Sequence, residues 1–307
     1  MNYLRMMVYM ENKPENTSVV SIVIINHNGK NQIEECLRSF FAHTPGDPFE
    51  VIVVDNDSKD GSVELLKSKF PQIRVLAQKK NYGFGKGNNI GVSESSGNFL
   101  FFVNNDTIFK EDIVTPLIQF LKENPSCGAV GPLLLNSDLT YQHSYGKFPS
   151  LMNELRTKRD TALFKNIPKD RSPRQVDWIS FAAVMIRRSA FVKVNGFDER
   201  YFIYFEDADL CFRLQNAGYQ SFYCAEYSLI HRCGGSRSQR VTNMIRTEYR
   251  RSQLLFYASH RSWFELSALR FYLLLRFSYS FLCTRGEEHH RARSVISMAL
   301  SSYANRS

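Results

Sequence analysis

The 307-residue sequence lacks the features that define several special classes of protein. Glycine and proline, with 16 and 10 copies and no period, are too few for a collagen-like or low-complexity chain. No stretch reaches the roughly 18 uncharged apolar residues of a membrane-spanning helix. The cysteines lack the short spacing of a zinc knuckle or redox dithiol and lie at Cys36, Cys127, Cys211, Cys224, Cys233 and Cys283. These absences predict an ordinary globular protein with reduced thiols.

The N-terminal segment lacks the pattern of a signal peptide. Residues 1–18 contain no apolar run followed by a small-residue cleavage site. We expect them to form an N-terminal extension and the protein to be cytoplasmic.

Lysine is absent from the C-terminal part of the chain, where arginine carries the positive charge. Residues 231–307 contain 13 Arg and 4 Glu, whereas residues 1–230 contain 26 basic and 26 acidic side chains. The net charge of +9 therefore belongs to a basic tail on a neutral body.

Short apolar runs alternate with helical stripes along the first hundred residues. Apolar side chains recur with helical spacing over residues 31–43 and 63–70. Continuous β-branched runs predict buried strands at residues 19–25 and 51–54, and residues 74–77 and 99–103 are interpreted as a shorter third strand and a fourth strand. This alternation predicts an α/β fold with a mostly parallel sheet. Residues 131–174 have a weak pattern and are expected to be irregular.

Polar clusters follow three of the predicted strands, at residues 26–29, 55–62 and 104–106. The carboxyl ends of parallel strands meet at one edge of an open α/β sheet, so we expect these loops to line one crevice. Residues 81–91 are interpreted as a glycine-rich loop. This segment has neither the ending of a P-loop nor the strand–turn–helix context of a dinucleotide fingerprint, so kinase and NAD dehydrogenase functions are unsupported.

Three carboxylates lie within four residues, at Glu206, Asp207 and Asp209. Like charges clustered beside apolar segments raise one another's pKa, which suits a general base. Acidic residues are also favourable in the first turn of a helix, where they interact with its dipole. The two interpretations are compatible and both remain open.

Oxygen donors and a histidine supply a candidate metal site. Asp106 follows two asparagines at the end of a predicted strand, a pattern that suits a hard divalent cation or a simple turn. A lone histidine, His231, is more often structural than a ligand. Its segment adds small residues and possible phosphate partners: Arg232, Gly234, Gly235, Ser236, Arg237 and Arg240.

In chain order these segments resemble the inverting family-2 glycosyltransferases of GT-A fold, most closely the bacterial rhamnosyltransferase-like branch. The resemblance covers about residues 19–236. It rests on VSIVIIN at 20–26, VDNDSKDGS at 54–62, NYGFGKGNNIG at 81–91, NNDT at 104–107, DW at 177–178, GFDE at 196–199, EDADL at 206–210 and the segment around His231. We therefore expect a Rossmann-like nucleotide-sugar-binding half at 19–130, an acceptor-binding and catalytic half at 131–240 and a helical C-terminal region at 241–307.

The resemblance implies roles for individual residues. Asp55 matches the acid that hydrogen-bonds the uracil or thymine ring, with Asn26 in the same pocket. Asp207 matches the catalytic base, supported by Glu206 and Asp209. Further contacts to the nucleotide sugar are expected from Asn28, Asn56, Ser58, Asn81, Gly83, Gly85, Asn88, Asn104 and Asn105.

The resemblance also implies a divalent cation, Mg²⁺ or Mn²⁺. Asn104 and Asp106 match the ends of the family's Asp-X-Asp metal motif, and His231 matches a further ligand. Because the first position is Asn here, its contact with the metal is expected to be neutral or water-mediated. Asp177 and Trp178 are implied to border the acceptor. Phe181 stands where the family usually has Gly, and its ring is expected to narrow that site.

The sequence pattern of the basic tail predicts an amphipathic helical region. On a helical wheel with about 100° per residue, most arginines of the tail fall in one sector and most apolar residues lie outside it. Arg270 is an exception. Such a surface suits anionic lipid on the cytoplasmic face of the inner membrane. Packing against the body or a second copy explains the pattern equally well. Nucleic acid is a poorer alternative because no recognised binding motif accompanies the arginines.

The sequence thus predicts a metal-dependent inverting glycosyltransferase that moves a hexose or deoxyhexose from a UDP- or dTDP-sugar to a glycan or lipid-linked glycan. Rhamnose is suggested by the resemblance alone. One rival is an inactive subunit that binds a sugar nucleotide or glycan, suggested by Asn104 and Phe181. The other rival is a nucleotidyltransferase, but the EDADL segment at residues 206–210 argues against it.

Overall fold

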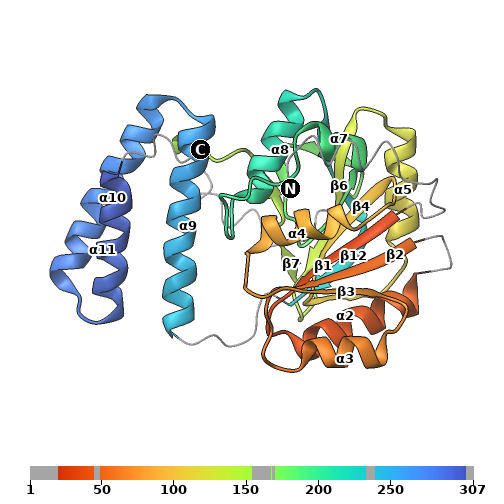
Figure 1. Cartoon of the computed structure of the whole chain (residues 1–307). Coiled ribbons are helices and arrows are strands. Elements are labelled where there is room, and N and C mark those ends of the chain that lie inside the picture. The colour runs from red at the N-terminus through yellow and green to blue at the C-terminus, as the bar shows by residue number, and fades with distance from the viewer. Residues whose placement is uncertain (1–19, 45–48, 154–166, 168–169, 233–238, 302–307) are drawn as a thin grey trace.

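The core of the protein is one ten-stranded sheet, seen in a computed structural model that describes residues 20–44, 49–153, 167, 170–232 and 239–301 (Figure 1). The strand order is β3-β2-β1-β4-β11-β6-β12-β5, with β7 beside β6 and β9 beside β12. The strands are β1 (Val20–Asn26), β2 (Phe49–Asp55), β3 (Arg74–Ala77), β4 (Phe99–Asn104), β5 (Thr107–Phe109), β6 (Cys127–Leu135), β7 (Tyr141–Gln142), β9 (Arg174–Val176), β11 (Ala183–Arg187) and β12 (Gln220–His231). The first four strands run parallel, as do β6 and β12, whereas β11 runs antiparallel between β4 and β6.

Helices cover both faces of this sheet, and alternate residues of each strand face opposite layers. In β1, Ile22 and Ile24 join the core under one set of helices, whereas Val23 joins the other core. The first set is α2 (Lys30–His43), α3 (Ser62–Lys69) and α5 (Val114–Glu123). The second set includes α4 (Phe84–Ser93), α7 (Arg188–Lys193) and α8 (Glu206–Asn216). The expected α/β architecture is therefore confirmed.

The interpretation of residues 81–91 as a loop is wrong, because most of this segment is helix α4. Its glycines allow the helix to lie close to the sheet. A Cβ atom at Gly87 would come within 3.0 Å of Ile25 Cδ1, and one at Gly91 would collide with the side chain of Val23. Only glycine therefore permits this distance between α4 and β1.

Replacing Gly91 with alanine is expected to destabilise the protein. The added methyl group would overlap Val23 and lie 3.2 Å from Val54 Cγ2. Overpacking costs about 1–3 kcal/mol, of which the better helix propensity of alanine offsets about 1 kcal/mol. Urea unfolding should show a lower midpoint for Gly91→Ala than for Ser93→Ala on the same helix. An unchanged midpoint would contradict the close packing of α4.

The expectation of irregular structure over residues 131–174 is only partly correct. Residues 131–135 continue strand β6, and β7 pairs back onto it. Two short strands, β8 (Tyr145–Gly146) and β10 (Trp178–Ile179), form a separate antiparallel pair. The N-terminal extension, the segment that follows Arg232 and the expected side-chain roles of Arg237 and Arg240 lie outside the described residues.

The tail forms three helices beside the α/β body, α9 (Gln239–His260), α10 (Trp263–Cys283) and α11 (Glu287–Leu300) (Figure 1). The single helical projection is wrong, because Ser262 caps a new helix by accepting a hydrogen bond from the Glu265 backbone N–H. Leu254, Phe256 and Leu273 belong to the same hydrophobic core as the sheet. Among the described residues, none of the helices is long and apolar enough to cross a membrane.

Candidate active site

The polar loops after β1 and β2 join through hydrogen bonds at one edge of the sheet. The Asn26 amide donates to Asp55 Oδ2 at 2.9 Å and to Ser58 Oγ at 3.2 Å. The Ser58 backbone N–H donates to Asp55 Oδ1 at 2.8 Å. Both carboxylate oxygens of Asp55 thus accept hydrogen bonds from the loops, and this side chain is only 1% exposed. Asp55 is therefore buried beneath the polar loops at this edge of the sheet.

Two further asparagines extend this network toward solvent. Asn105, from the loop after β4, donates its amide to Asn26 Oδ1 at 2.7 Å. The exposed Asn28 accepts from the Lys59 backbone N–H with its side-chain oxygen, and its own backbone N–H donates to Ser58 Oγ. The three strand ends that the sequence predicted to form one crevice are therefore connected, with Asn28 at the surface.

The segment before α4 closes one side of the crevice. Asn56 donates its amide to the Gly83 carbonyl at 2.9 Å, and Asn81 Oδ1 accepts from the Gly83 N–H at 2.9 Å. A Cβ atom at Gly83 would collide with the Phe202 carbonyl, so this turn lies against the segment that leads to α8. Gly85 and Asn88 are buried within α4 and pack toward the protein interior.

The three residues expected to hold a metal lie together. Asp106 Oδ1 is 3.2 Å from His231 Nε2, and the Asn104 amide nitrogen is 3.1 Å from the same ring atom. The pairing of β5 with β12 brings them together, since Thr107 is opposite His231. Gln142 Oε1 lies 2.7 Å from His231 Nδ1.

This arrangement fits a divalent cation bound partly by the protein. Gln142 Oε1 can accept a hydrogen bond from an Nδ1–H of His231, and in that tautomer the Nε2 lone pair would be available to a cation beside Asp106. No group of three or more His, Cys, Asp or Glu side chains around a possible metal position occurs within the described part of the chain. The protein therefore offers an imidazole, one carboxylate and the Asn104 amide, and a diphosphate would supply further oxygen ligands.

The three clustered carboxylates occupy the first turn of α8. Glu206 and Asp209 are buried, whereas Asp207 is half-buried. Desolvation raises the pKa of Asp207 to about 6, despite the hydrogen bond that it accepts from the Ala208 N–H at 2.7 Å. Desolvation and the neighbouring charges of Asp207 and Asp209 raise the pKa of Glu206 well above its ordinary value. Asp207 is therefore the accessible carboxylate with a pKa suited to a base near neutral pH.

Asp209 has a different environment that sequence reasoning did not foresee. Its Oδ2 accepts two hydrogen bonds from Arg213, at 2.6 and 2.8 Å, and its Oδ1 lies 2.6 Å from His260 Nε2 at the end of α9. Arg213 also donates to the backbone carbonyls of Val194 and Gly196. Arg213 could have been found from its i,i+4 spacing, whereas no sequence signal pointed to His260. Asp209 thus ties α8 to α9.

A strained turn positions these carboxylates. Tyr204 and Phe205, directly before α8, have φ angles of 69° and 67°, in the left-handed region that non-glycine residues rarely adopt. The Phe205 ring packs against Tyr249 and Phe256 of α9, with ring centroids 5.1 and 5.9 Å apart. Contacts with α9 therefore help to hold the backbone that presents Asp207.

Of the two expected acceptor residues, Trp178 lies in β10 and Asp177 directly precedes this strand, against which α8 packs. Asp177 accepts a hydrogen bond from the Phe148 N–H at 3.1 Å, and the Trp178 indole donates to the Lys147 carbonyl at 3.0 Å. Phe181 is only 3% exposed, and its ring packs against the core ring of Phe197 at 5.3 Å.

Two solved glycosyltransferases have a fold similar to that of this chain. The mannosyltransferase PcManGT of Pyrobaculum calidifontis, in complex with GDP-Man and Mn²⁺, has a TM-score of 0.58 at 15% identity, covering 97% of this chain and 90% of its own. GalNAc-T7, with UDP, GalNAc and Mn²⁺, has a TM-score of 0.55 at 16% identity, over 81% of this chain and 52% of its own. The chain therefore shares the GT-A fold of these structures.

The chain belongs to glycosyl transferase family 2, whose family model matches residues 21–194. A second model, the N-terminal domain of galactosyltransferase, matches residues 174–244. The N-acetylglucosaminyl-diphospho-decaprenol L-rhamnosyltransferase of Mycobacterium tuberculosis is 27% identical over 85% of this chain and 94% of its own length. Rhamnosyltransferase WbbL of Escherichia coli (strain K12) is 32% identical over 69% of this chain and 83% of its own length.

Proposed function

We propose that this protein is an inverting transferase that moves a hexose or deoxyhexose, such as rhamnose, from a UDP- or dTDP-sugar to a lipid-linked glycan in polysaccharide synthesis. The observation that carries the proposal is the half-buried Asp207, with a pKa raised to about 6, on a helix that packs beside the acceptor residues. The rhamnosyltransferase relatives support the choice of donor sugar and acceptor class. A nucleotidyltransferase has no comparable support.

The donor nucleotide occupies the crevice at the carboxyl ends of β1, β2 and β4. This half of the active site comprises residues 19–130, with residues 131–240 forming the acceptor and catalytic half. Asp55 and Asn26 lie at the floor to orient the base, and Asn28 with Ser58 borders its open side. A Mg²⁺ or Mn²⁺ ion held by Asp106 and His231, with Asn104 beside them, would neutralise the negative charge that develops on the leaving diphosphate.

The reaction is a single displacement in which Asp207 accepts the proton of an acceptor hydroxyl. That oxygen forms a bond to the anomeric carbon as the bond between this carbon and the diphosphate oxygen breaks, so the configuration inverts. Burial favours the protonated form of Glu206 and Arg213 pairs with Asp209, which leaves Asp207 as the carboxylate for the role of base. The Trp178 ring provides a flat apolar face for the acceptor sugar.

We propose that the C-terminal region attaches the enzyme to the cytoplasmic face of a membrane. Five apolar side chains of α10 are exposed and fall within a sector of about 80° at helical spacing: Phe264, Phe271, Leu275, Tyr279 and Leu282. The opposite side of α10, with Leu269 and Leu273, packs into the core. An exposed apolar stripe in an arginine-rich region suits shallow insertion between anionic lipids.

Calorimetric titration with UDP and dTDP, each with and without Mn²⁺, tests the donor assignment. We expect one of the two nucleotides to bind and Mn²⁺ to tighten this binding at least about tenfold, because a cation at Asp106 neutralises the diphosphate. The same titration of Asp106→Asn should show no tightening. Absence of nucleotide binding by the folded protein would overturn the proposal. Nucleotide binding without sugar transfer to any acceptor would indicate an inactive binding subunit.

A further inference from the structure

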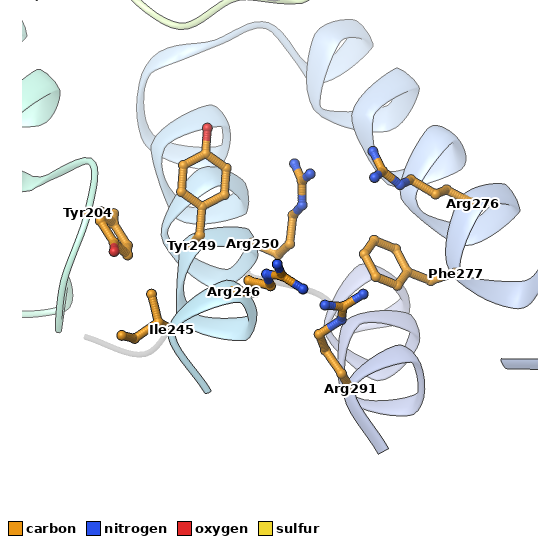
Figure 2. Close-up of a pocket in the computed structure, with 8 residues that line it drawn as sticks. All are labelled: Tyr204, Ile245, Arg246, Tyr249, Arg250, Arg276, Phe277 and Arg291. Atoms are coloured by element: carbon orange, nitrogen blue, oxygen red, sulfur yellow. The ribbon is translucent and has the colours of Figure 1, made fainter. Parts of the chain in front are cut away.

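A pocket lies among the three C-terminal helices, away from the proposed donor residues. It has a volume of about 480 Å³ and is lined by four arginines, Arg246 and Arg250 of α9, Arg276 of α10 and Arg291 of α11. Figure 2 shows these guanidinium groups extending from three helices into the space between them. Arg246 is 58% exposed, so solvent reaches the pocket.

The positive charge of this pocket is only partly neutralised. Glu288 lies 2.6 Å from Arg291 and 3.8 Å from Arg246. Arg250 and Arg276 make neutral contacts, with Gln253 and the Tyr272 hydroxyl. The four cations therefore outnumber the carboxylate that faces them.

Arg291 is largely buried at the wall of the pocket. Its side chain is 16% exposed, and its Nε–H is buried with no hydrogen-bond partner among the described residues. Burial and the positive charges of Arg246, Arg276 and Arg250 lower its pKa. An anion in the pocket would offset this repulsion among the four guanidinium groups.

The pocket adjoins the turn that carries the proposed base. Tyr204 lines it, with its ring 5.8 Å from Tyr249 of α9. Tyr204 is three residues before Asp207, so their Cα atoms are at most about 11 Å apart. This span is comparable to the length of one sugar joined to a diphosphate. Phe277 adds an apolar wall suited to the first carbons of a lipid.

We propose that the four-arginine pocket binds the diphosphate group of the lipid-linked acceptor and so directs the acceptor sugar toward Asp207. This inference rests on the proposed transferase function and adds a second anion site to it. Several guanidinium groups on different helices match several phosphate oxygens better than a single carboxylate. The exposed stripe of α10 would lie in the lipid from which the acceptor extends.

Calorimetry with farnesyl diphosphate in EDTA tests the pocket without requiring sugar transfer. Removing divalent cations disfavours binding of the diphosphate at the donor crevice. We expect the Arg246→Gln/Arg291→Gln variant to bind this probe at least about tenfold more weakly than the wild type, because two charge-assisted contacts are lost. The matched control is Arg285→Gln/Arg293→Gln, which removes two exposed arginines outside the pocket and should bind normally. Equal binding by both variants would overturn the inference.

Two further measurements separate the possible sources of the phosphate. With vesicles of phosphatidylcholine and phosphatidylglycerol, both variants should lose similar affinity, because the membrane attraction depends on total charge. A loss confined to the pocket variant, without competition by farnesyl diphosphate, would assign the pocket to a phospholipid headgroup and contradict the acceptor site. In transfer assays with a lipid-diphosphate sugar acceptor, the pocket variant should have a higher KM for the acceptor than the wild type and the same KM for the donor.

These measurements also distinguish the inference from the function on which it rests. If the wild type transfers no sugar but binds farnesyl diphosphate through Arg246 and Arg291, the transferase proposal fails and the anion pocket remains. If transfer occurs and the pocket variant has an unchanged KM for the acceptor, the pocket assignment fails alone. UDP binding with Mn²⁺ should be unaffected in the pocket variant, which shows that the protein remains folded.

Discussion

Replacing Asp207 with asparagine is expected to lower the rate of sugar transfer by about 10²- to 10⁴-fold, the usual contribution of a general base. The amide has nearly the shape of the carboxylate and cannot accept the hydroxyl proton. Nucleotide binding should be unchanged, since Asp207 lies on α8 and the donor residues lie at the ends of β1, β2 and β4. Steady-state kinetics with donor and acceptor varied separately would measure the effect.

The pH dependence of the wild type follows from the same group. The pKa of Asp207 is raised to about 6, so the basic form is lost as the pH falls below 6. We expect kcat/KM to fall about tenfold per pH unit there, whereas an ordinary aspartate would keep the rate constant down to about pH 4. The residual rate of Asp207→Asn should lack this step.

Stability separates this catalytic effect from unfolding. Because the pKa of Asp207 is higher in the folded protein than its ordinary value, the folded state binds more protons and is destabilised as the pH rises toward 6. Asparagine cannot ionise, so the variant should be at least as stable as the wild type at pH 7. The control Asp112→Asn keeps the cap of α5, where Asp112 accepts from the Val114 N–H at 2.9 Å. Transfer by Asp207→Asn at the rate of this control would remove Asp207 from the role of base.

Removing the proposed metal ligand Asp106 should lower transfer by at least about 10²-fold. The expected loss corresponds to several kcal/mol of stabilisation of the leaving diphosphate. The Asp106→Asn variant should also need a higher Mn²⁺ concentration for half-maximal rate, because a carboxylate ligand becomes neutral. His231→Gln should shift the Mn²⁺ dependence in the same direction, since Nε2 of His231 faces Asp106 at 3.2 Å.

A positioning variant provides the comparison for these ligands. Gln142→Leu leaves both ligands in place and removes the partner of His231 Nδ1. Removing such a partner of a metal-binding histidine typically lowers metal affinity by about 10- to 100-fold. We expect its Mn²⁺ dependence to shift and its nucleotide binding without metal to stay normal. Mn²⁺ dependence identical to the wild type in Asp106→Asn and His231→Gln would exclude this metal site.

The sequence was sufficient to predict the α/β layers and the edge at which polar loops meet. Continuous apolar runs such as residues 51–54 identify strands that are buried on both faces, and the apolar stripe of residues 31–43 identifies a helix. These signals are local, because each depends on the spacing of side chains within one element. The loops that begin after β1, β2 and β4 were predicted to converge because parallel strands end at a common edge. The hydrogen bonds of Asn26 with Asp55 and with Asn105 show that they do.

Local patterns were insufficient to predict helix α4, the division of the C-terminal region into separate helices and the burial of Phe181. The glycines of residues 81–91 weaken a helical signal, yet α4 forms because packing against Val23 requires a helix without side chains on that face. The tail was projected as one helix, although a turn at Ser262 divides it into elements with independent faces. The expectation for Phe181 came from the residue that the family usually has at this position, whereas in this structure the ring is buried in the core.

The sequence alone determined which elements form and which side chains stand at the ends of the strands, because backbone geometry and apolar spacing act over a few residues. Only the tertiary structure decided which distant groups became partners. His260 lies 51 residues from Asp209, and Gln142 lies 89 residues from His231. The arginine pocket likewise needs three helices to meet. Such contacts depend on how helices and strands pack against one another, and no short-range sequence pattern specifies that packing.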